Sequence, residues 1–419
     1  MASTSSSSEL PDGTVLVPAP LVHVAFNQHG THFVAATATD FHVFSCHPLE
    51  RVMRRRGSGG CTFKVTSAQL LTRSQLAVAT RRPSAVSGAV DGHVIDFWNG
   101  MCKPKDARTN TVRSLCGAVG GFRLRGDHML VAGEGTATLF DGVHWEKEVT
   151  TGPNPLGLCA MEEPNGPATL VYALPLPEAG MVQVRRRGRA SSVSVHAHGS
   201  GVACLALSPD GRLLATAGTR GTLLRIFSTA DGTKLQELRR GTEGADIHCI
   251  TFSHDSKWLA VSNDKATVHV FSINDFNLTS STLEEDHASN DLLAAPLVLP
   301  SSPAPATTNQ ISSRMSFLKG YLPTYFSSKW SFAQFRIPNA WTKCSVAFDR
   351  RHPNTITIVC MDKRCVEEAK ITLSILYRHT CHMCNILSHT RMWFYRCEFD
   401  PVKGGDMVPG VYHENFMDL

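Results

Sequence analysis

The sequence predicts an all-β protein, a seven-bladed β-propeller built from four-stranded blades, and three observations lead to that fold class. Short segments of strand type follow one another along the chain, and the N-terminal half contains no long amphipathic helical pattern. Two segments are internal copies with a spacing of 45 residues, which is the length of one propeller blade. The 419 residues suffice for seven blades of roughly 43 residues, with a surplus for a tail and insertions.

The N-terminal half begins with a tail and continues as strands. Residues 1–20 are rich in Ser and Pro, so we expect a disordered tail ahead of one propeller domain spanning 21–419. Turn-type residues separate the expected strands that follow. These strands are 21–27, 32–36, 41–46, 90–98, 112–124, 128–132 and 136–140.

The internal repeat lies in the middle of the chain. The segment from Val202 to Asp210 matches the segment from Ile247 to Asp255, and both end in Ser-x-Asp. A weaker copy starts at Val24. One blade cannot bury both of its faces, so the copies predict several blades packed radially around a channel.

Two segments interrupt the pattern. Residues 275–320 form a long loop in the sixth blade, and residues 363–391 form an irregular insertion that we expect to disturb the last blade. A connection of that length inside a compact domain is usually functional or disordered. Between and after these segments we expect strands at 330–337, 343–348, 355–360 and 393–399.

Composition excludes several classes of protein. The net charge of +5 and the 42% hydrophobic content fit a soluble globular protein, and the N-terminus has no apolar core of a secretory signal. Thirteen scattered cysteines predict reduced, buried thiols in a cytosolic protein. Cys381 and Cys384 are spaced like zinc ligands but lack a second pair, so we expect no metal site. Nucleotide-binding and hydrolase motifs are absent, so we expect no enzyme and no cofactor.

Arg239 and Arg240 are the strongest candidates for binding. Successive side chains in a strand point to opposite faces, so the two guanidinium groups would enter two different neighbouring spaces. Each could bind phosphate oxygens, and Gly241 would allow a sharp turn or a close approach. The ordinary alternative is a solvated basic pair at a strand end. Nucleic-acid binding is a competing class, but the 8% aromatic content and near-balanced charge argue against it.

Several motifs around this pair occur together in one known family. Leu238-Arg-Arg-Gly241 is preceded by Gly221-Thr-Leu-Leu-Arg225-Ile-Phe and followed by Ser253-His-Asp. The segments 322–332 and 394–405 agree with the same family. From about residue 198 to 335, and again from 393, the sequence resembles the PROPPIN family, and a looser resemblance covers 21–187.

The resemblance implies a WD40-like propeller that binds phosphatidylinositol 3-phosphate and phosphatidylinositol 3,5-bisphosphate in autophagosome formation. It implies two binding sites on the rim. By motif, the first contains His198, Thr222, Arg225 and Arg239, and the second contains Arg240, Ser262, Lys265, Thr267 and His269, with His254 nearby. It also implies an autophagy lipid-transfer partner protein. The expected location is cytoplasmic, peripheral on preautophagosomal, endosomal or vacuolar membranes.

The sequence departs from the family pattern beside both sites. Gly218 replaces the usual Ser of the first site, which removes a hydroxyl donor, although Arg220 lies close by; Ala266 replaces a usual Gly before Thr267. A WD40-like protein-interaction scaffold with weakened or lost lipid binding is therefore the second interpretation. The 275–320 loop occupies the place of the family's membrane-inserting loop. Its candidate inserting residues are Leu292, Leu293, Leu297, Val298 and Leu299.

Overall fold

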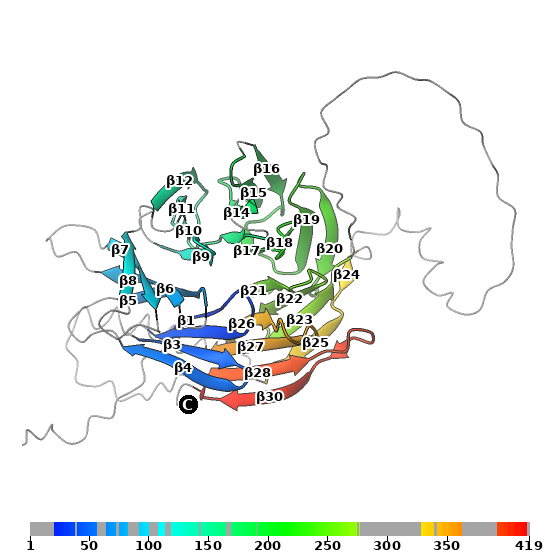
Figure 1. Ribbon diagram of the computed structural model, residues 1–419. Coiled ribbons are helices and arrows are strands. Elements are labelled where there is room, and N and C mark those ends of the chain that lie inside the picture. Colours follow the sequence, from blue (N-terminus) through cyan, green and yellow to red (C-terminus); the bar gives the residue numbers. More distant parts are fainter. Residues whose placement is uncertain are drawn as a thin grey trace, which may run out of the picture.

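The computed structural model is a ring of seven β-sheets, and its described residues form an all-β propeller (Figure 1). The structure describes residues 21–37, 40–56, 64–72, 75–82, 92–99, 108–113, 119–141, 144–164, 169–189, 191–274, 276, 328–338, 342–362 and 392–416. Among these residues, no helix is long and apolar enough to span a bilayer. The predicted fold class is confirmed.

The first four blades are antiparallel four-stranded sheets. Blade 1 is β1 (Leu21–Phe26), β2 (His32–Thr37), β3 (Asp40–Cys46) and β4 (Leu49–Arg56). Blade 2 is β5 (Lys64–Leu70), β6 (Gln75–Arg82), β7 (Gly92–Asn99) and β8 (Arg108–Arg113). Blade 3 is β9 (Gly121–Arg125), β10 (His128–Ala132), β11 (Thr136–Asp141) and β12 (His144–Thr150). Blade 4 is β13 (Ala160–Glu162), β14 (Val171–Pro175), β15 (Met181–Arg186) and β16 (Ser192–His196).

Blades 5 and 6 each carry a fifth element, and blade 7 is a complete four-stranded sheet. Blade 5 is β17 (Val202–Leu207), β18 (Leu213–Gly218), β19 (Leu223–Ser228), β20 (Lys234–Arg239) and β24 (Lys329–Trp330). Blade 6 is β21 (Ile247–Phe252), β22 (Trp258–Asn263), β23 (Thr267–Ser272), β25 (Ala333–Arg336) and β29 (Gly405–Asp406). Blade 7 is β26 (Thr342–Phe348), β27 (Thr355–Asp362), β28 (Met392–Glu398) and β30 (Val408–Glu414).

The sequence repeat corresponds to a repeated turn between the first and second strands of blades 5 and 6. In blade 5 the Ser208 hydroxyl donates to the Asp210 carboxylate over 2.5 Å and accepts the Leu213 N–H. In blade 6 Ser253 makes the same two hydrogen bonds, to Asp255 and from the Trp258 N–H. The Ser-x-Asp motif therefore fixes the same tight turn twice, because its side chains satisfy backbone donors that the turn leaves unpaired.

The core lies between neighbouring blades, and the same kind of packing closes the ring. Blades 7 and 1 share one apolar cluster, in which Phe33, Phe44, Phe394 and Phe416 are all buried. Their rings meet in stacked and edge-on pairs 5.2–6.3 Å apart. Aromatic burial of this kind supplies much of the stability at a contact, so the last residues of the described chain hold the first blade in place.

Two predicted strands are wrong in their extent. The segment 112–124 divides into β8 and β9, which belong to different blades, and Gly120 before β9 and Gly121 at its start pack against the backbone of Gly157. The segment 330–337 divides into β24, which pairs with β20 of blade 5, and β25, which belongs to blade 6. A run of residues typical of strands does not reveal such a change of sheet.

The last blade and the cysteines also differ from expectation. β27 and β28 pair without a register shift up to Met361 and Met392, so the insertion between them leaves their described pairing undisturbed. Cys344 and Cys360 form a disulfide between β26 and β27, contrary to the expectation of reduced thiols. They are directly opposite each other in the strand register, which brings the two sulfurs together. The tail, the 275–320 loop except for residue 276, and the 363–391 insertion lie outside the described residues.

Candidate functional site

Arg239 is the last residue of β20 and Arg240 follows it, and both are nearly buried, with exposed fractions of 9% and 8%. This burial is inconsistent with the ordinary alternative of a solvated basic pair. The Arg239 Nε donates to the Ser328 hydroxyl over 3.1 Å, next to β24 on the outer edge of blade 5. The Arg240 Nε donates to the Gly221 carbonyl over 2.9 Å, and its guanidinium also donates to the Glu243 carbonyl. The two side chains thus contact different neighbouring elements.

Arg240 is bound by neutral groups in this structure. Among the described residues, its guanidinium lies within ion-pair distance of no carboxylate. Burial lowers the pKa of Arg240, and the charges of Asp264 and Glu243 act in the opposite direction. A nearly buried guanidinium that is held only by carbonyls retains a charge that an anion could neutralise.

The first group of candidate residues is assembled around His198 and Arg225. The His198 ring is buried, and its Nε2 lies 2.9 Å from the Thr216 hydroxyl. Burial, followed by the charge of Arg225, lowers the pKa of His198 to about 4. Arg225 donates to Glu237 over 2.9 Å and to the Ala197 carbonyl over 2.7 Å. Its charge is therefore already paired in the absence of a ligand.

Gly218 lies directly against the His198 ring. A Cβ atom at this position would lie 3.0 Å from both Cγ and Nδ1 of His198, and 3.0 Å from the Ser200 hydroxyl. Ser200 thus places a hydroxyl beside the position where the family pattern has its serine. The sequence argument did not identify Ser200, because the motif gives no indication that this residue folds back onto the end of β18.

The second group is assembled around His269, on β23. Its Nε2 lies 3.0 Å from the Thr267 hydroxyl, and its buried Nδ1 has no hydrogen-bond partner among the described residues. Burial, followed by the charge of Arg240, lowers the pKa of His269 to about 4. Lys265 is exposed in the turn before β23. Ser262 is fully buried and donates to the Cys344 carbonyl of blade 7 over 2.7 Å.

His254 does not join the second group. It lies in the turn between β21 and β22, where its ring is 6.2 Å from that of His29 in blade 1. Lys265 and Thr267 follow the opposite end of β22, and six strand residues span roughly 20 Å. The expectation that His254 lies near the second group is therefore wrong, because a whole strand separates them.

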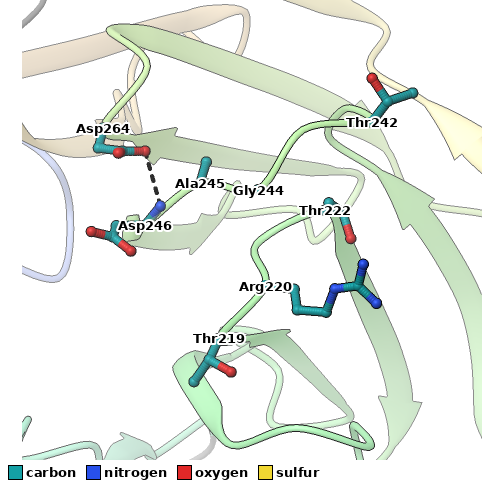
Figure 2. Close-up of a pocket in the computed structure, with 8 residues that line it drawn as sticks. All are labelled: Thr219, Arg220, Thr222, Thr242, Gly244, Ala245, Asp246 and Asp264. Atoms are coloured by element: carbon teal, nitrogen blue, oxygen red, sulfur yellow. Dashed lines mark hydrogen bonds between the residues drawn. The ribbon is translucent and has the colours of Figure 1, made fainter.

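A pocket of about 330 Å³ opens between blades 5 and 6. Its walls are the β18–β19 turn, the connection from β20 to β21, and the β22–β23 turn (Figure 2). Thr222 is the only residue of the two candidate groups that lines it, and Arg220 extends its side chain beside Thr222. Asp246 and Asp264 line the other side, where the Asp264 carboxylate accepts the Asp246 N–H over 2.9 Å. The pocket combines a cation and hydroxyls with two acids, so it is less suited to phosphate than the surroundings of Arg240.

Comparison with known proteins shows the family of the chain. The model of the PROPPIN family matches residues 20–295. Autophagy-related protein 18e of Arabidopsis thaliana is 30% identical over 402 residues, which cover 95% of this chain and 88% of the relative. Autophagy-related protein 18 of Dictyostelium discoideum is 34% identical over 189 residues, which cover 44% of this chain and 48% of the relative.

Solved structures agree with the fold. Hsv2 of Kluyveromyces lactis has a TM-score of 0.60 at 18% identity, over 94% of this chain and 99% of that structure. KlAtg21, solved in complex with the coiled-coil of AgAtg16, has a TM-score of 0.63 at 14% identity, over 94% of this chain and 99% of that structure. The family model matches about two thirds of the chain, and a relative of 30% identity is covered over 88% of its length, so the chain belongs to the PROPPIN family, the phosphoinositide-binding β-propellers of autophagy.

Proposed function

We propose that this protein binds phosphatidylinositol 3-phosphate and phosphatidylinositol 3,5-bisphosphate at two adjacent sites on the rim of blades 5 and 6. The first site uses His198, Thr222, Arg225 and Arg239, and the second uses Arg240, Lys265, Thr267 and His269. Ser262 is fully buried and donates to the Cys344 carbonyl, so its part in the second site is to hold β22 against blade 7. Two weak sites on one rigid rim act together, because binding of one headgroup raises the effective concentration of the next.

One observation carries this proposal: a nearly buried guanidinium without a carboxylate partner lies beside an unpartnered imidazole nitrogen. Arg240 supplies the first group and His269 supplies the second. Burying polar groups without full partners costs free energy, and functional sites are where proteins retain such groups. A phosphate between the two would accept from Arg240 and from a protonated His269.

The test is flotation with liposomes that contain each phosphoinositide in turn, using the Arg239→Thr/Arg240→Thr double variant. Each charged hydrogen bond contributes about 1.5–3 kcal/mol, so losing both guanidiniums should weaken binding about 100-fold or more. The matched control is Arg185→Thr/Arg186→Thr, an adjacent arginine pair on β15 of blade 4. It removes the same charge from a neighbouring blade.

Two results would refute the proposal. One is unchanged flotation of the Arg239/Arg240 variant when its thermal unfolding is normal. The other is an equal loss in the Arg185/Arg186 control, which would indicate diffuse attraction to an anionic surface. Preserved binding to nucleic acid in the same assay, with lipid binding absent, would favour the competing class.

The 275–320 loop is assigned the membrane-inserting role on position and composition. Partial insertion of apolar side chains adds to headgroup binding, since two signals anchor more firmly than one. Deleting the five apolar residues between 292 and 299 should weaken flotation without changing the preferred headgroup. The wider role is recruitment of autophagy machinery, including a lipid-transfer partner, to preautophagosomal, endosomal or vacuolar membranes.

A further inference from the structure

A cluster of one arginine and two histidines lies away from the rim, at one mouth of the central channel. The first strands of the blades, among them β1, β21 and β26, contact one another around the channel. The turns that follow these strands therefore surround its mouth. In blade 1 the turn contains Gly30, whose φ is +64°, and a Cβ there would lie 2.0 Å from the Phe348 carbonyl oxygen. The turn of blade 1 is thus pressed against blade 7.

Three blades contribute a cationic or titratable group to this mouth. Arg350 of blade 7 has its Nη1 3.1 Å from Nδ1 of His29 in blade 1. The His29 ring lies 6.2 Å from the ring of His254 in blade 6. His29 and Arg350 are exposed, and His254 is half-buried, so the cluster is open to solvent. Residues so distant in sequence meet here only because the ring closes.

The acids around the mouth are engaged elsewhere. Glu162 of blade 4 forms two hydrogen bonds with Arg125 of blade 3, over 2.8 and 2.6 Å, and accepts from Gln28 over 3.4 Å. Asp349 accepts from Arg396 over 3.0 Å and pairs with His352 over 2.9 Å. Among the described residues, no carboxylate lies within ion-pair distance of the Arg350 guanidinium. Arg350 therefore lies beside two histidines, with no carboxylate within ion-pair distance of its guanidinium among the described residues.

We propose that Arg350, His29 and His254 form an anion-binding site at the channel mouth, which binds a carboxylate side chain from an acidic segment of a partner protein. The guanidinium fork matches a carboxylate, and each imidazole offers a donor once it is protonated. An extended segment suits the position, because the three groups come from the turns of three different blades around the channel mouth. The site is separate from the rim sites and does not depend on them.

The local electrostatics determine how the site responds to pH. Burial and the charges of Arg350, His254 and Arg125 lower the pKa of His29. Burial and Arg350 lower the pKa of His254, while hydrogen bonds to the backbone of His29 and of Phe348, and the charge of Asp349, act in the opposite direction. A bound carboxylate would oppose both effects and favour the protonated rings. Affinity for an acidic segment should therefore rise as the pH falls from 7.5 to 5.5.

The test uses the full chain and a fluorescein-labelled octaglutamate peptide, with fluorescence anisotropy as the measurement. Arg350→Gln should weaken binding about tenfold, and His29→Gln should remove most of the pH dependence. The matched control is Arg212→Gln, in the corresponding turn of blade 5, because Arg212 is already paired with Asp210 over 3.1 Å. The control should stay within about twofold of the parent protein.

Three results would overturn the proposal. Arg350→Gln and His29→Gln could both bind the peptide as the parent does. Arg212→Gln could lose as much affinity as Arg350→Gln, which would mean that net charge alone attracts the peptide. Inorganic phosphate could displace the peptide at an equal concentration of anionic groups, which would assign the site to a free small anion. Flotation with phosphoinositide liposomes should be unaffected by Arg350→Gln, so this inference and the rim proposal can fail separately.

Discussion

Gly218→Ser restores the residue that the family pattern has in the first site, yet the structure predicts that it weakens the site. The added Cβ would lie 3.0 Å from two atoms of the His198 ring and from the Ser200 hydroxyl. Contacts this close are tighter than nearly all real Cβ contacts, so these neighbours would have to move by a few tenths of an ångström. Ser200 can rotate, but His198 is buried and held against Thr216.

The expected magnitude follows from overpacking a buried site. Inserting an atom group into a well-packed region costs about 1–3 kcal/mol, and we expect about 1–2 kcal/mol here because Ser200 can yield. If His198 turns away to relieve the contact, phosphoinositide affinity of the first site should fall about 5- to 10-fold. Denaturant unfolding measures the first effect and liposome flotation measures the second.

The control for this substitution is Gly199→Ser. A Cβ at Gly199 would have no heavy atom within 4 Å, so the same chemical change adds a hydroxyl without crowding. It should leave stability and binding nearly unchanged. If Gly218→Ser binds lipid more tightly than the parent at unchanged stability, then the family serine fits this chain, and the argument from His198 and Ser200 is refuted.

Three further predictions concern stability. Ala266→Gly should stabilise the protein by about 0.5–1 kcal/mol in denaturant unfolding. Ala266 has a φ of +53°, a conformation that costs an L-residue about 1–2 kcal/mol and glycine little. A denaturation midpoint equal to or lower than that of the parent protein would contradict this. Phe416→Ala should destabilise the protein by about 3–5 kcal/mol, because it opens the apolar cluster between blades 7 and 1. The control Tyr412→Ala, at a half-exposed residue on β30, should cost less than about 1.5 kcal/mol. Equal losses would mean that Phe416 does not hold the ring of blades closed. The pKa values of His198 and His269 are lowered from 6.5 to about 4, so the fold is fully stable only above pH 6.5, where both rings are neutral. Each histidine should lower the free energy of unfolding by about 2 kcal/mol between pH 7 and pH 5. Replacing both with Gln should flatten the stability profile in that window, and an unchanged profile would show that these rings are protonated freely.

The blades could be predicted from local sequence patterns, whereas the pairing of strands that are distant in the chain could not be predicted. The Ser-x-Asp turn carries its own hydrogen bonds within six residues, so its repeat in blades 5 and 6 was visible in the sequence. β24 and β29 are two residues each and pair with strands far away in the chain. Such short strands have no periodicity that a sequence argument can detect.

The same distinction applies to the candidate site. Alternation along β20 was sufficient to predict that Arg239 and Arg240 contact different neighbours. The partner of Arg225 is Glu237, which lies opposite it in the register of β19 with β20. The error about His254 has a similar origin, because nearness in the sequence hid its position at the other end of a strand. Register and strand length are three-dimensional facts, and the motif alone does not contain them.

The two groups on the rim differ in what a phosphate must displace, and this difference determines which of them dominates. At the first group, a phosphate competes with Glu237, a carboxylate 2.9 Å from Arg225 that also repels it. At the second group, it replaces neutral carbonyls on Arg240 and finds an unpartnered nitrogen on His269. Hydrogen bonds between charged groups are stronger than those to neutral partners, so the exchange is more favourable at the second group. Arg240→Thr should therefore cost more affinity in flotation than Arg225→Thr, and equal losses would mean that Glu237 leaves Arg225 without an energetic cost.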